Sequence, residues 1–315
     1  MPDVVCIGQS IVDVFVGGAQ DEFDPGRRVK YCDSITLEIG GDATNESRVL
    51  KRLGVDVAIV HGRGDDGAGM LLKGLFDQDG VDLSQTIVFP GLSSGAAILL
   101  LPKDRNEERS VIACREGRSH LTFKVTPQMI QGAKIVSFAS LFYEPFRDPE
   151  YVYSAAKLVK DSGAILCADC NVNPNANVND YADSFKFIDY FFPNDGEAFH
   201  FSGTDSVEAA ADFFFNMGVK NVILKTGKNG GYVKNAQGAF YFPAYYVPKV
   251  VDLTGAGDNF AAGFICGLLE GKPLKECLRF ACATASIAIQ TVGASTGVRS
   301  KQQVLDVISA NEYKI

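Results

Sequence analysis

The chain has 315 residues, of which 46% are hydrophobic and 22% charged, and its formal net charge is -8. This hydrophobic fraction excludes an intrinsically disordered chain, and the length allows two domains or one large domain with an insertion. The negative charge argues against nucleic acid or an anionic membrane as the main partner, since both bind basic surfaces. An anionic small-molecule ligand stays possible, because backbone N–H groups can bind a phosphate.

Short apolar runs alternate with helical patterns along most of the chain. Continuous apolar runs indicate strands buried on both faces, and their alternation with helices predicts right-handed strand–helix–strand units. The sequence therefore predicts an α/β fold with a doubly wound, mostly parallel sheet flanked by helices. In chain order we expect a strand at 4–8, a helix at 45–53, a strand at 57–61, a helix at 70–77, a strand at 135–138, a helix at 149–160, strands at 164–169 and 190–193, a helix at 207–217, a strand at 221–225 and a helix at 259–269.

Two stretches, 13–39 and 94–113, interrupt this alternation, because their short strand-like runs have no helices between them. If they pair with each other, they form a small β-sheet that projects from the body as a lid; the alternative is two unrelated surface excursions. We favour the paired lid. The predicted boundaries are 1–12, 40–93 and 119–315 for the α/β body and 13–39 and 94–118 for the β lid.

The chain shows no signal peptide and no apolar segment long enough for a membrane helix. We therefore expect a cytoplasmic protein with reduced thiols, and eight cysteines are too few for a disulfide scaffold in a chain of this length. Cys167 and Cys170 have the C-x-x-C spacing of redox and zinc motifs but end an apolar run. We interpret them as part of a core strand, with a redox or zinc role as the alternative.

The sharpest chemical signal is the glycine-rich segment 252–258, Asp-Leu-Thr-Gly-Ala-Gly-Asp, which opens the last predicted helix. Gly255, Ala256 and Gly257 have little or no side chain, so their N–H groups can form an anion hole, strengthened by the helix dipole. Asp258 is either a cap of this helix or a general base beside the hole. Complete Walker A, dinucleotide-binding and protein-kinase motifs are absent from the sequence.

Four segments together resemble the signatures of the ribokinase-like (PfkB) family of carbohydrate kinases. They occur in the family's order, and the resemblance spans residues 8 to about 297, nearly the whole chain. One departure is Leu253, where many members have a small or β-branched residue. The resemblance implies a ribokinase-like fold with a β lid and an ATP-dependent kinase that phosphorylates a hydroxyl of a small sugar. The four segments are GGDATNES (40–47), PNDGE (193–197), KTGKNGG (225–231) and DLTGAGDNFAAG (252–263).

The resemblance implies roles for the candidate residues on the side of ATP and Mg²⁺. Asp258 would deprotonate the sugar hydroxyl, and the N–H groups before it would form the anion hole. Asn194 and Glu197 would organise Mg²⁺ through water; the alternative for Glu197 is an ordinary acid in the first turn of a helix. Lys225 is expected only to flank the nucleotide. The residues assigned to ATP binding are Asn194, Glu197, Lys225, Thr226, Gly227, Gly230 and Ser286.

The sugar would lie at the carboxyl edge of the strands, under the lid. Asp13 would accept hydrogen bonds from vicinal hydroxyls, and the lid would close over the sugar and exclude water. The alternative for Gly40 and Gly41 is a turn before the first helix. Lids in the family often form dimer interfaces, so a homodimer through the lid is expected. The residues assigned to the sugar are Asp13, Gly40, Gly41, Asn45, Arg115 and Asn171.

Many members of the family also bind a monovalent cation beside the anion hole, and by this resemblance a potassium ion could bind here. The turn at 291–297 contains the glycines that such a site needs. The residues assigned to the cation are Asp252, Thr254, Ala288, Thr291, Gly293 and Gly297.

The sequence defines the phosphoryl acceptor less well than it defines the kinase reaction. Asp42 stands where sugar-phosphate kinases of the family generally have a basic residue, and its carboxylate would repel a phosphorylated sugar. We therefore favour a neutral sugar, fructose or ribose. A 2-keto-3-deoxygluconate kinase, which could bind its carboxylate with Arg115, and a nucleoside kinase stay open. A non-catalytic sugar or nucleotide sensor is the non-enzyme alternative, and the retained Asp258 and Glu197 argue against it.

Overall fold

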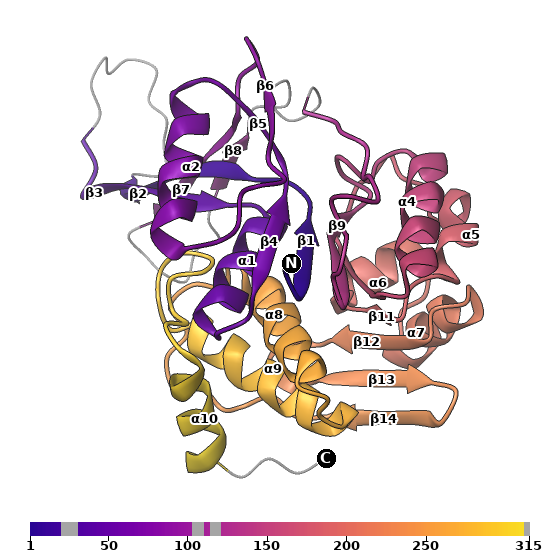
Figure 1. Cartoon of the computed structure of the whole chain (residues 1–315). Coiled ribbons are helices and arrows are strands. Elements are labelled where there is room, and N and C mark those ends of the chain that lie inside the picture. The colour runs from indigo at the N-terminus through magenta and orange to yellow at the C-terminus, as the bar shows by residue number, and fades with distance from the viewer. Residues whose placement is uncertain (20–30, 103–109, 114–120, 312–315) are drawn as a thin grey trace.

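An eight-stranded sheet runs through the centre of the molecule, with helices on both faces (Figure 1). The computed structural model describes residues 1–19, 31–102, 110–113 and 121–311. The strands from β12 to β4 are parallel, and β13 and β14 extend the sheet as an antiparallel hairpin. The predicted α/β fold is confirmed. In spatial order the strands are β14 (Gly238–Phe242), β13 (Gly231–Asn235), β12 (Asn221–Lys225), β11 (Tyr190–Phe191), β10 (Ile165–Cys170), β9 (Ile135–Leu141), β1 (Val4–Ile7) and β4 (Val57–Val60).

The helices pack on the two faces of this sheet and form two hydrophobic cores. Successive side chains of a strand point to opposite faces, so Val4 and Cys6 of β1 pack with α1, α8 and α9, while Val5 and Ile7 pack with α4 to α7. None of the described helices is long and apolar enough to cross a membrane. The helices are α1 (Asp42–Arg52), α2 (Gly67–Asp79), α4 (Pro149–Ser162), α5 (Ala182–Phe185), α6 (Asp195–Ser202), α7 (Val207–Asn216), α8 (Ala256–Leu269), α9 (Leu274–Ala288) and α10 (Lys301–Ala310), with 3-10 helices at Val178–Tyr181 and Gly227–Asn229.

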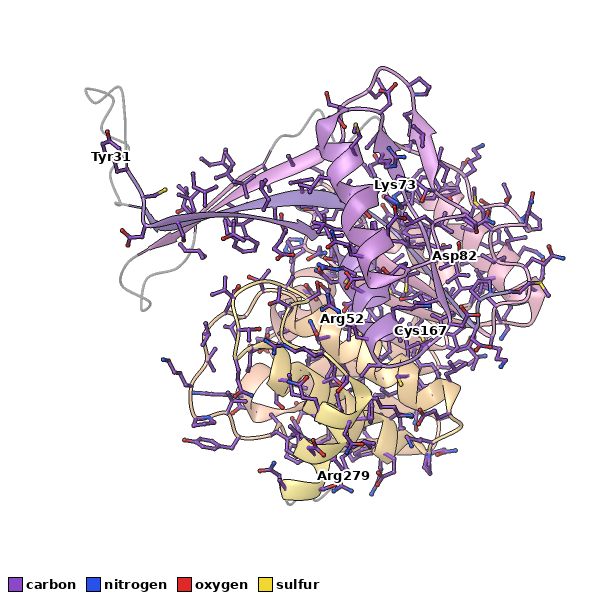
Figure 2. The ribbon with its side chains drawn as sticks, turned by 60° about the vertical axis from the view of Figure 1, so that its left-hand side comes forward. Tyr31, Arg52, Lys73, Asp82, Cys167 and Arg279 are labelled. Atoms are coloured by element: carbon purple, nitrogen blue, oxygen red, sulfur yellow. The ribbon has the colours of Figure 1, made fainter. Side chains whose placement is uncertain are left out.

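A second sheet of four strands extends away from the body, with Tyr31 near its outer end (Figure 2). Its central strand β2 pairs antiparallel with β3 and parallel with β7, so the two excursions from the α/β pattern do pair with each other. A short two-stranded sheet, β5 (Gly62–Gly64) with β6 (Ile87–Phe89), lies between them in the chain. The strands of the second sheet are β2 (Ile11–Ala19), β3 (Ser34–Gly40), β7 (Gly95–Pro102) and β8 (Ser110–Ala113).

Several elements differ from the sequence expectations for local reasons. α2 begins three residues earlier than predicted, because the Asp66 carboxylate caps it by accepting a hydrogen bond from the Gly69 N–H. The hairpin of β13 and β14 was not predicted, because we assigned its first glycines to the nucleotide. A Cβ at Gly230 would lie 1.9 Å from the Phe242 carbonyl oxygen, so this glycine is required by the hairpin itself.

The two cysteines of the C-x-x-C pair lie on β10 and are both buried. Cys167 packs in the core beneath α8 and α9, and Cys170 packs in the opposite core, because residues three apart on a strand face opposite sides. The two thiols therefore do not converge on one ligand. This geometry supports the interpretation as a core strand.

Glu46 is a carboxyl group inside the body, one residue after Asn45 on α1. Its side chain is 0% exposed, and neither of its oxygens has a hydrogen bond of normal geometry among the described residues. Burial raises the pKa of Glu46 to about 8. The folded protein therefore keeps this carboxyl protonated at neutral pH.

We expect the Glu46→Gln variant to be more stable than the wild type, by an amount that grows with pH. The folded-state pKa of about 8 lies above the unfolded value of 4.5, so the wild type loses stability as the pH rises from 4.5 to 8, and the loss is constant at higher pH. Glutamine has no proton to lose. Urea unfolding should show a stability gain about 3 to 4 kcal/mol larger near pH 8 than near pH 5. An equal difference at both pH values would contradict the buried, protonated carboxyl.

Candidate active site

A cleft of about 720 Å³ lies where the carboxyl ends of the parallel strands meet the N-termini of α1 and α8 and the inner end of the second sheet. Open α/β sheets generally bind ligands at this edge. The structure therefore brings residues from the start, middle and end of the chain to one place. The predicted site residues that line the cleft are Asp13, Gly41, Asn45, Asn171, Asn194, Glu197, Lys225, Thr254, Gly255, Ala256, Gly257 and Asp258.

The glycine-rich segment forms the N-terminus of α8 and lines the cleft. Gly255 is the N-cap with a φ of 71°, and a Cβ there would lie 2.3 Å from the Ala294 carbonyl oxygen, so only glycine fits. The Ala256 N–H donates to the Leu253 carbonyl at 3.2 Å, which differs from its expected role as a free anion-hole donor. The N–H groups of Gly257 and Asp258 have no such partner in the described ranges. The N–H groups that stay available for an anion at this helix end are therefore those of Gly257 and Asp258.

Asp258 lies in the first turn of α8 and is buried. Its Oδ2 accepts a 2.6 Å hydrogen bond from Asn45 Nδ2 on α1. Burial raises the pKa of Asp258 well above its usual range, and the nearby Asp42 adds to the rise, while the Asn45 hydrogen bond opposes it. No side chain caps α8, so the geometry favours a general base over a helix cap.

Asn45 and the glycine pair Gly40–Gly41, which we assigned to the sugar, make close contacts within the protein. Asn45 gives its amide N–H to Asp258, and its Oδ1 is buried without a partner among the described residues, so it positions the carboxylate. Gly41 is the N-cap of α1 with a φ of 94°, where a Cβ would lie 2.5 Å from the Gln9 carbonyl oxygen. A Cβ at Gly40 would lie 2.0 Å from Asp13 Oδ2, so Gly40 leaves room for this carboxylate without lining the cleft itself.

Further polar groups of the cleft lie at the carboxyl ends of β9 and β10 and at the start of α1. Ser140 Oγ donates to Asp42 Oδ2 at 2.7 Å, and Asn171 Nδ2 donates to the same oxygen. Tyr143 also lines the cleft, and its hydroxyl donates to the Val172 carbonyl. Ser140 and Tyr143 were not predicted, because no motif contains them. Their position at the carboxyl end of a buried strand is the signal that could have found them.

Lys225, which we expect to flank the nucleotide, forms an ion pair with Asp169. Its Nζ lies 2.6 Å from Asp169 Oδ2, and the two side chains are only 13% and 6% exposed. A Cβ at Gly257 would lie 3.0 Å from this ammonium, so Lys225 points toward the first turn of α8. Asp169 is not among the residues that the sequence assigns to the site. The two residues form a buried ion pair inside the cleft.

Asn194 and Glu197 form a capping box at the start of α6. Asn194 Oδ1 accepts from the Glu197 N–H at 2.9 Å, and Glu197 Oε2 accepts from the Asn194 N–H at 2.8 Å, so the helix-acid alternative holds for one oxygen of Glu197. Burial raises the pKa of Glu197 to about 7. Ligand atoms of Asp169, Cys170 and Glu197 lie within 4.8 Å of one another. The two carboxylates suit Mg²⁺ held through water, whereas a thiol does not.

The remaining candidates lie outside the cleft. The Thr226 N–H donates to the Gly230 carbonyl at 2.8 Å, and with Gly227 these residues form the turn that opens the β13–β14 hairpin. Ser286 is buried on α9 and donates to the Ala283 carbonyl. None of these residues lines the cleft in the part of the chain that the structure describes. Arg115 lies outside the described residues.

The residues assigned to a monovalent cation lie together behind the anion hole. Asp252 Oδ1 accepts from the Thr254 N–H at 2.9 Å, and Asp252 Oδ2 accepts from the Gly293 N–H at 3.0 Å. Thr291 Oγ1 donates to the Ala288 carbonyl at 3.3 Å, and a Cβ at Gly297 would lie 2.8 Å from Thr291 Oγ1. The two segments therefore pack closely, and cation binding there stays a prediction.

Comparison with known proteins relates this geometry to a family. Residues 1–301 match the family described as pfkB family carbohydrate kinase. The ribokinase of Haemophilus influenzae is 28% identical over 277 residues, which are 86% of this chain and 88% of that protein. The ATP-dependent 6-phosphofructokinase of Thermoanaerobacterium thermosaccharolyticum is 26% identical over 303 residues, 93% of this chain and 89% of that protein.

The solved structures agree with the sequence comparisons. The structure of Arabidopsis thaliana ribokinase complexed with ribose and ATP has a TM-score of 0.83 and 25% sequence identity, and the match covers 98% of both chains. The predicted ribokinase-like fold is thereby confirmed. The chain belongs to the PfkB family of carbohydrate kinases, which transfer a phosphoryl group to an alcohol acceptor.

Proposed function

We propose that the protein transfers the γ-phosphoryl group of ATP to a hydroxyl of a small neutral sugar, fructose or ribose, with Asp258 as the base. The observation that carries this proposal is the buried Asp258 carboxylate beside the open N-terminus of α8, in one cleft with the polar side chains of Asp13 and Asp42. Both carboxylates can accept hydrogen bonds from sugar hydroxyls, and both disfavour a phosphorylated acceptor. The relatives are named for different acceptors, so the choice of sugar rests on these residues.

The arrangement supports a direct transfer. Asp258 takes the proton of the acceptor hydroxyl while Asn45 holds the carboxylate in place. The acceptor oxygen forms a bond to the γ-phosphorus as the bond to the ADP oxygen breaks, and the N–H groups of Gly257 and Asp258 stabilise the negative charge on the group in transfer. Mg²⁺ neutralises phosphate charge when it is bound, and Asn194 and Glu197 would hold it through water.

We expect the wild type to release ADP with a neutral sugar as the acceptor in a screen of fructose, ribose, a nucleoside, 2-keto-3-deoxygluconate and fructose 6-phosphate. Turnover confined to the acidic or phosphorylated acceptors would contradict the assignment of Asp13 and Asp42, and no turnover with any acceptor would contradict the kinase.

The Asp258→Asn variant tests the base in the same assay. We expect a loss of about 1000-fold in kcat with nearly unchanged ATP binding, because the amide cannot take the hydroxyl proton. The Asp161→Asn variant, which alters an exposed ion pair with Lys157 on α4, is the matched control. Near-normal turnover of Asp258→Asn would remove Asp258 from the mechanism.

We also propose that K⁺ activates the enzyme through the segments that Asp252 joins. A cation there would fix the loop before α8 and hence the anion hole. We expect kcat to rise when K⁺ replaces a bulky organic cation in the assay buffer. Equal turnover in both buffers would contradict cation activation.

The second sheet supports a proposed homodimer through the lid. Leu37, Val14, Ile98 and Ile112 are cross-strand neighbours on one face of this sheet. Leu37, Ile98 and Ile112 are 53%, 38% and 49% exposed. A contiguous apolar row of this kind is typical of an interface, and two copies of the same row are complementary to each other.

We expect the Ile98→Asp variant to be monomeric in sedimentation analysis, because a carboxylate cannot be buried in an apolar interface without a partner. The wild type should sediment as a dimer. Tyr153→Asp is the control, since Tyr153 lies on α4 in the body and is similarly exposed at 37%. A wild-type monomer, or an Ile98→Asp dimer, would contradict this interface.

A further inference from the structure

We propose that the ammonium group of Lys225 contacts the phosphoryl group during its transfer and that Asp169 positions it there; this inference rests on the proposed kinase function. Lys225 is the last residue of β12, and Asp169 lies next to the last residue of β10. Both strands neighbour β11, and all three run parallel. Their carboxyl ends therefore deliver both side chains to the same edge of the sheet, and both line the cleft.

The Lys225 side chain points toward the N-terminus of α8. Its Nζ lies 3.0 Å and its Cε 3.9 Å from the place that a Cβ of Gly257 would occupy. Gly257 stands between Ala256 and Asp258 in the first turn of α8. The ammonium group therefore reaches the anion hole itself, and the absence of a side chain at Gly257 leaves the space between them open.

The ion pair between Lys225 and Asp169 is largely buried. A buried ion pair loses hydration, and its replacement by apolar side chains is often neutral or stabilising, so stability alone does not account for it. This pair is also not enclosed in a core, because both residues line the cleft that we assign to the substrates. A cation kept in such a place suits a ligand that brings negative charge.

Lys225 also brings a positive charge to the cleft. Among the cleft-lining residues that the structure describes, Lys225 is the sole lysine or arginine. It therefore supplies the positive charge that the protein itself can place at the anion hole.

Asp169 positions Lys225 and is not a second base. Its Oδ1 accepts a 2.8 Å hydrogen bond from the Cys170 N–H, and its Oδ2 holds the ammonium at 2.6 Å. One oxygen thus fixes the carboxylate on β10, and the other fixes Lys225. Phosphoryl transfer depends mainly on positioning and on neutralising charge on the equatorial oxygens, and a fixed cation provides both.

The test compares Lys225→Met with Lys225→Arg and with Lys220→Met in the full-length protein. Lys220 is the matched control, because it forms an ion pair with Asp189 at the opposite end of β12 and its side chain is 50% exposed. We expect Lys225→Met to lose about 100-fold to 1000-fold in kcat while KM for ATP and for sugar changes less than about threefold. Lys225→Arg should recover part of the loss, and Lys220→Met should match the wild type.

A second measurement separates catalysis from a structural role. Aluminium fluoride with MgADP and sugar mimics the phosphoryl group in transfer, so we expect it to tighten ADP binding by the wild type. Lys225→Met should bind MgADP alone as the wild type does but show no tightening. Asp169→Asn should lower kcat about tenfold with little change in KM, because Lys225 keeps its charge but loses its fixed position.

The outcomes distinguish this inference from the proposed function. A wild type without turnover on any acceptor would overturn both. A wild type that turns over, together with a Lys225→Met variant whose kcat stays within about threefold or whose ADP binding still tightens with aluminium fluoride, would overturn only the role of Lys225. Loss of MgADP binding together with a lower Tm in both Lys225 variants would assign Lys225 to the structure and would also overturn the inference.

Discussion

The hydrogen bond from Asn45 to Asp258 joins the two helices on which the rest of the site depends. Gly41 is the N-cap of α1 and Gly255 is the N-cap of α8, and both residues line the cleft. The two helices also pack against each other within one hydrophobic core. Because both helices start at the same edge of the sheet, one side-chain contact fixes the Asp258 carboxyl relative to both helix ends. A change in the packing of either helix would therefore reach the chemistry through this bond.

The same edge of the sheet concentrates negative charge. Burial raises the pKa of both Asp258 and Glu197, and the nearby carboxylates of Asp42 and Asp169 add to both rises. Lys225 offsets part of this repulsion through its ion pair with Asp169. The acidic character of the chain is thus compatible with an anionic ligand, because backbone N–H groups and one lysine offer positive charge in the same cleft.

Much of this arrangement could be predicted from the sequence, and the reasons for the misses are physical. The buried strands and the glycine-rich start of α8 follow from local patterns, since apolar runs and positive-φ glycines leave a signal within a few residues. The partner of Asn45 and the direction of the Lys225 side chain do not follow from local patterns, because each depends on a residue far away in the chain. Asn45 and Asp258 are 213 positions apart, and Lys225 and Asp169 are 56 positions apart. Ser140 has no motif at all and enters the site because of where β9 ends.

The cleft is lined partly by elements of the central body and partly by the second sheet and a loop. This division explains why sequence motifs indicate the reaction but not the acceptor. The anion hole, Asp258 and Lys225 lie on α8 and β12, elements whose position is fixed by the central sheet and its cores. The residues that we assign to the acceptor include Asp13 from the second sheet and Asn171 from the segment after β10. Neither place belongs to α8 or β12. A family can therefore keep one reaction and change its sugar, and the residues that choose the sugar have no common motif.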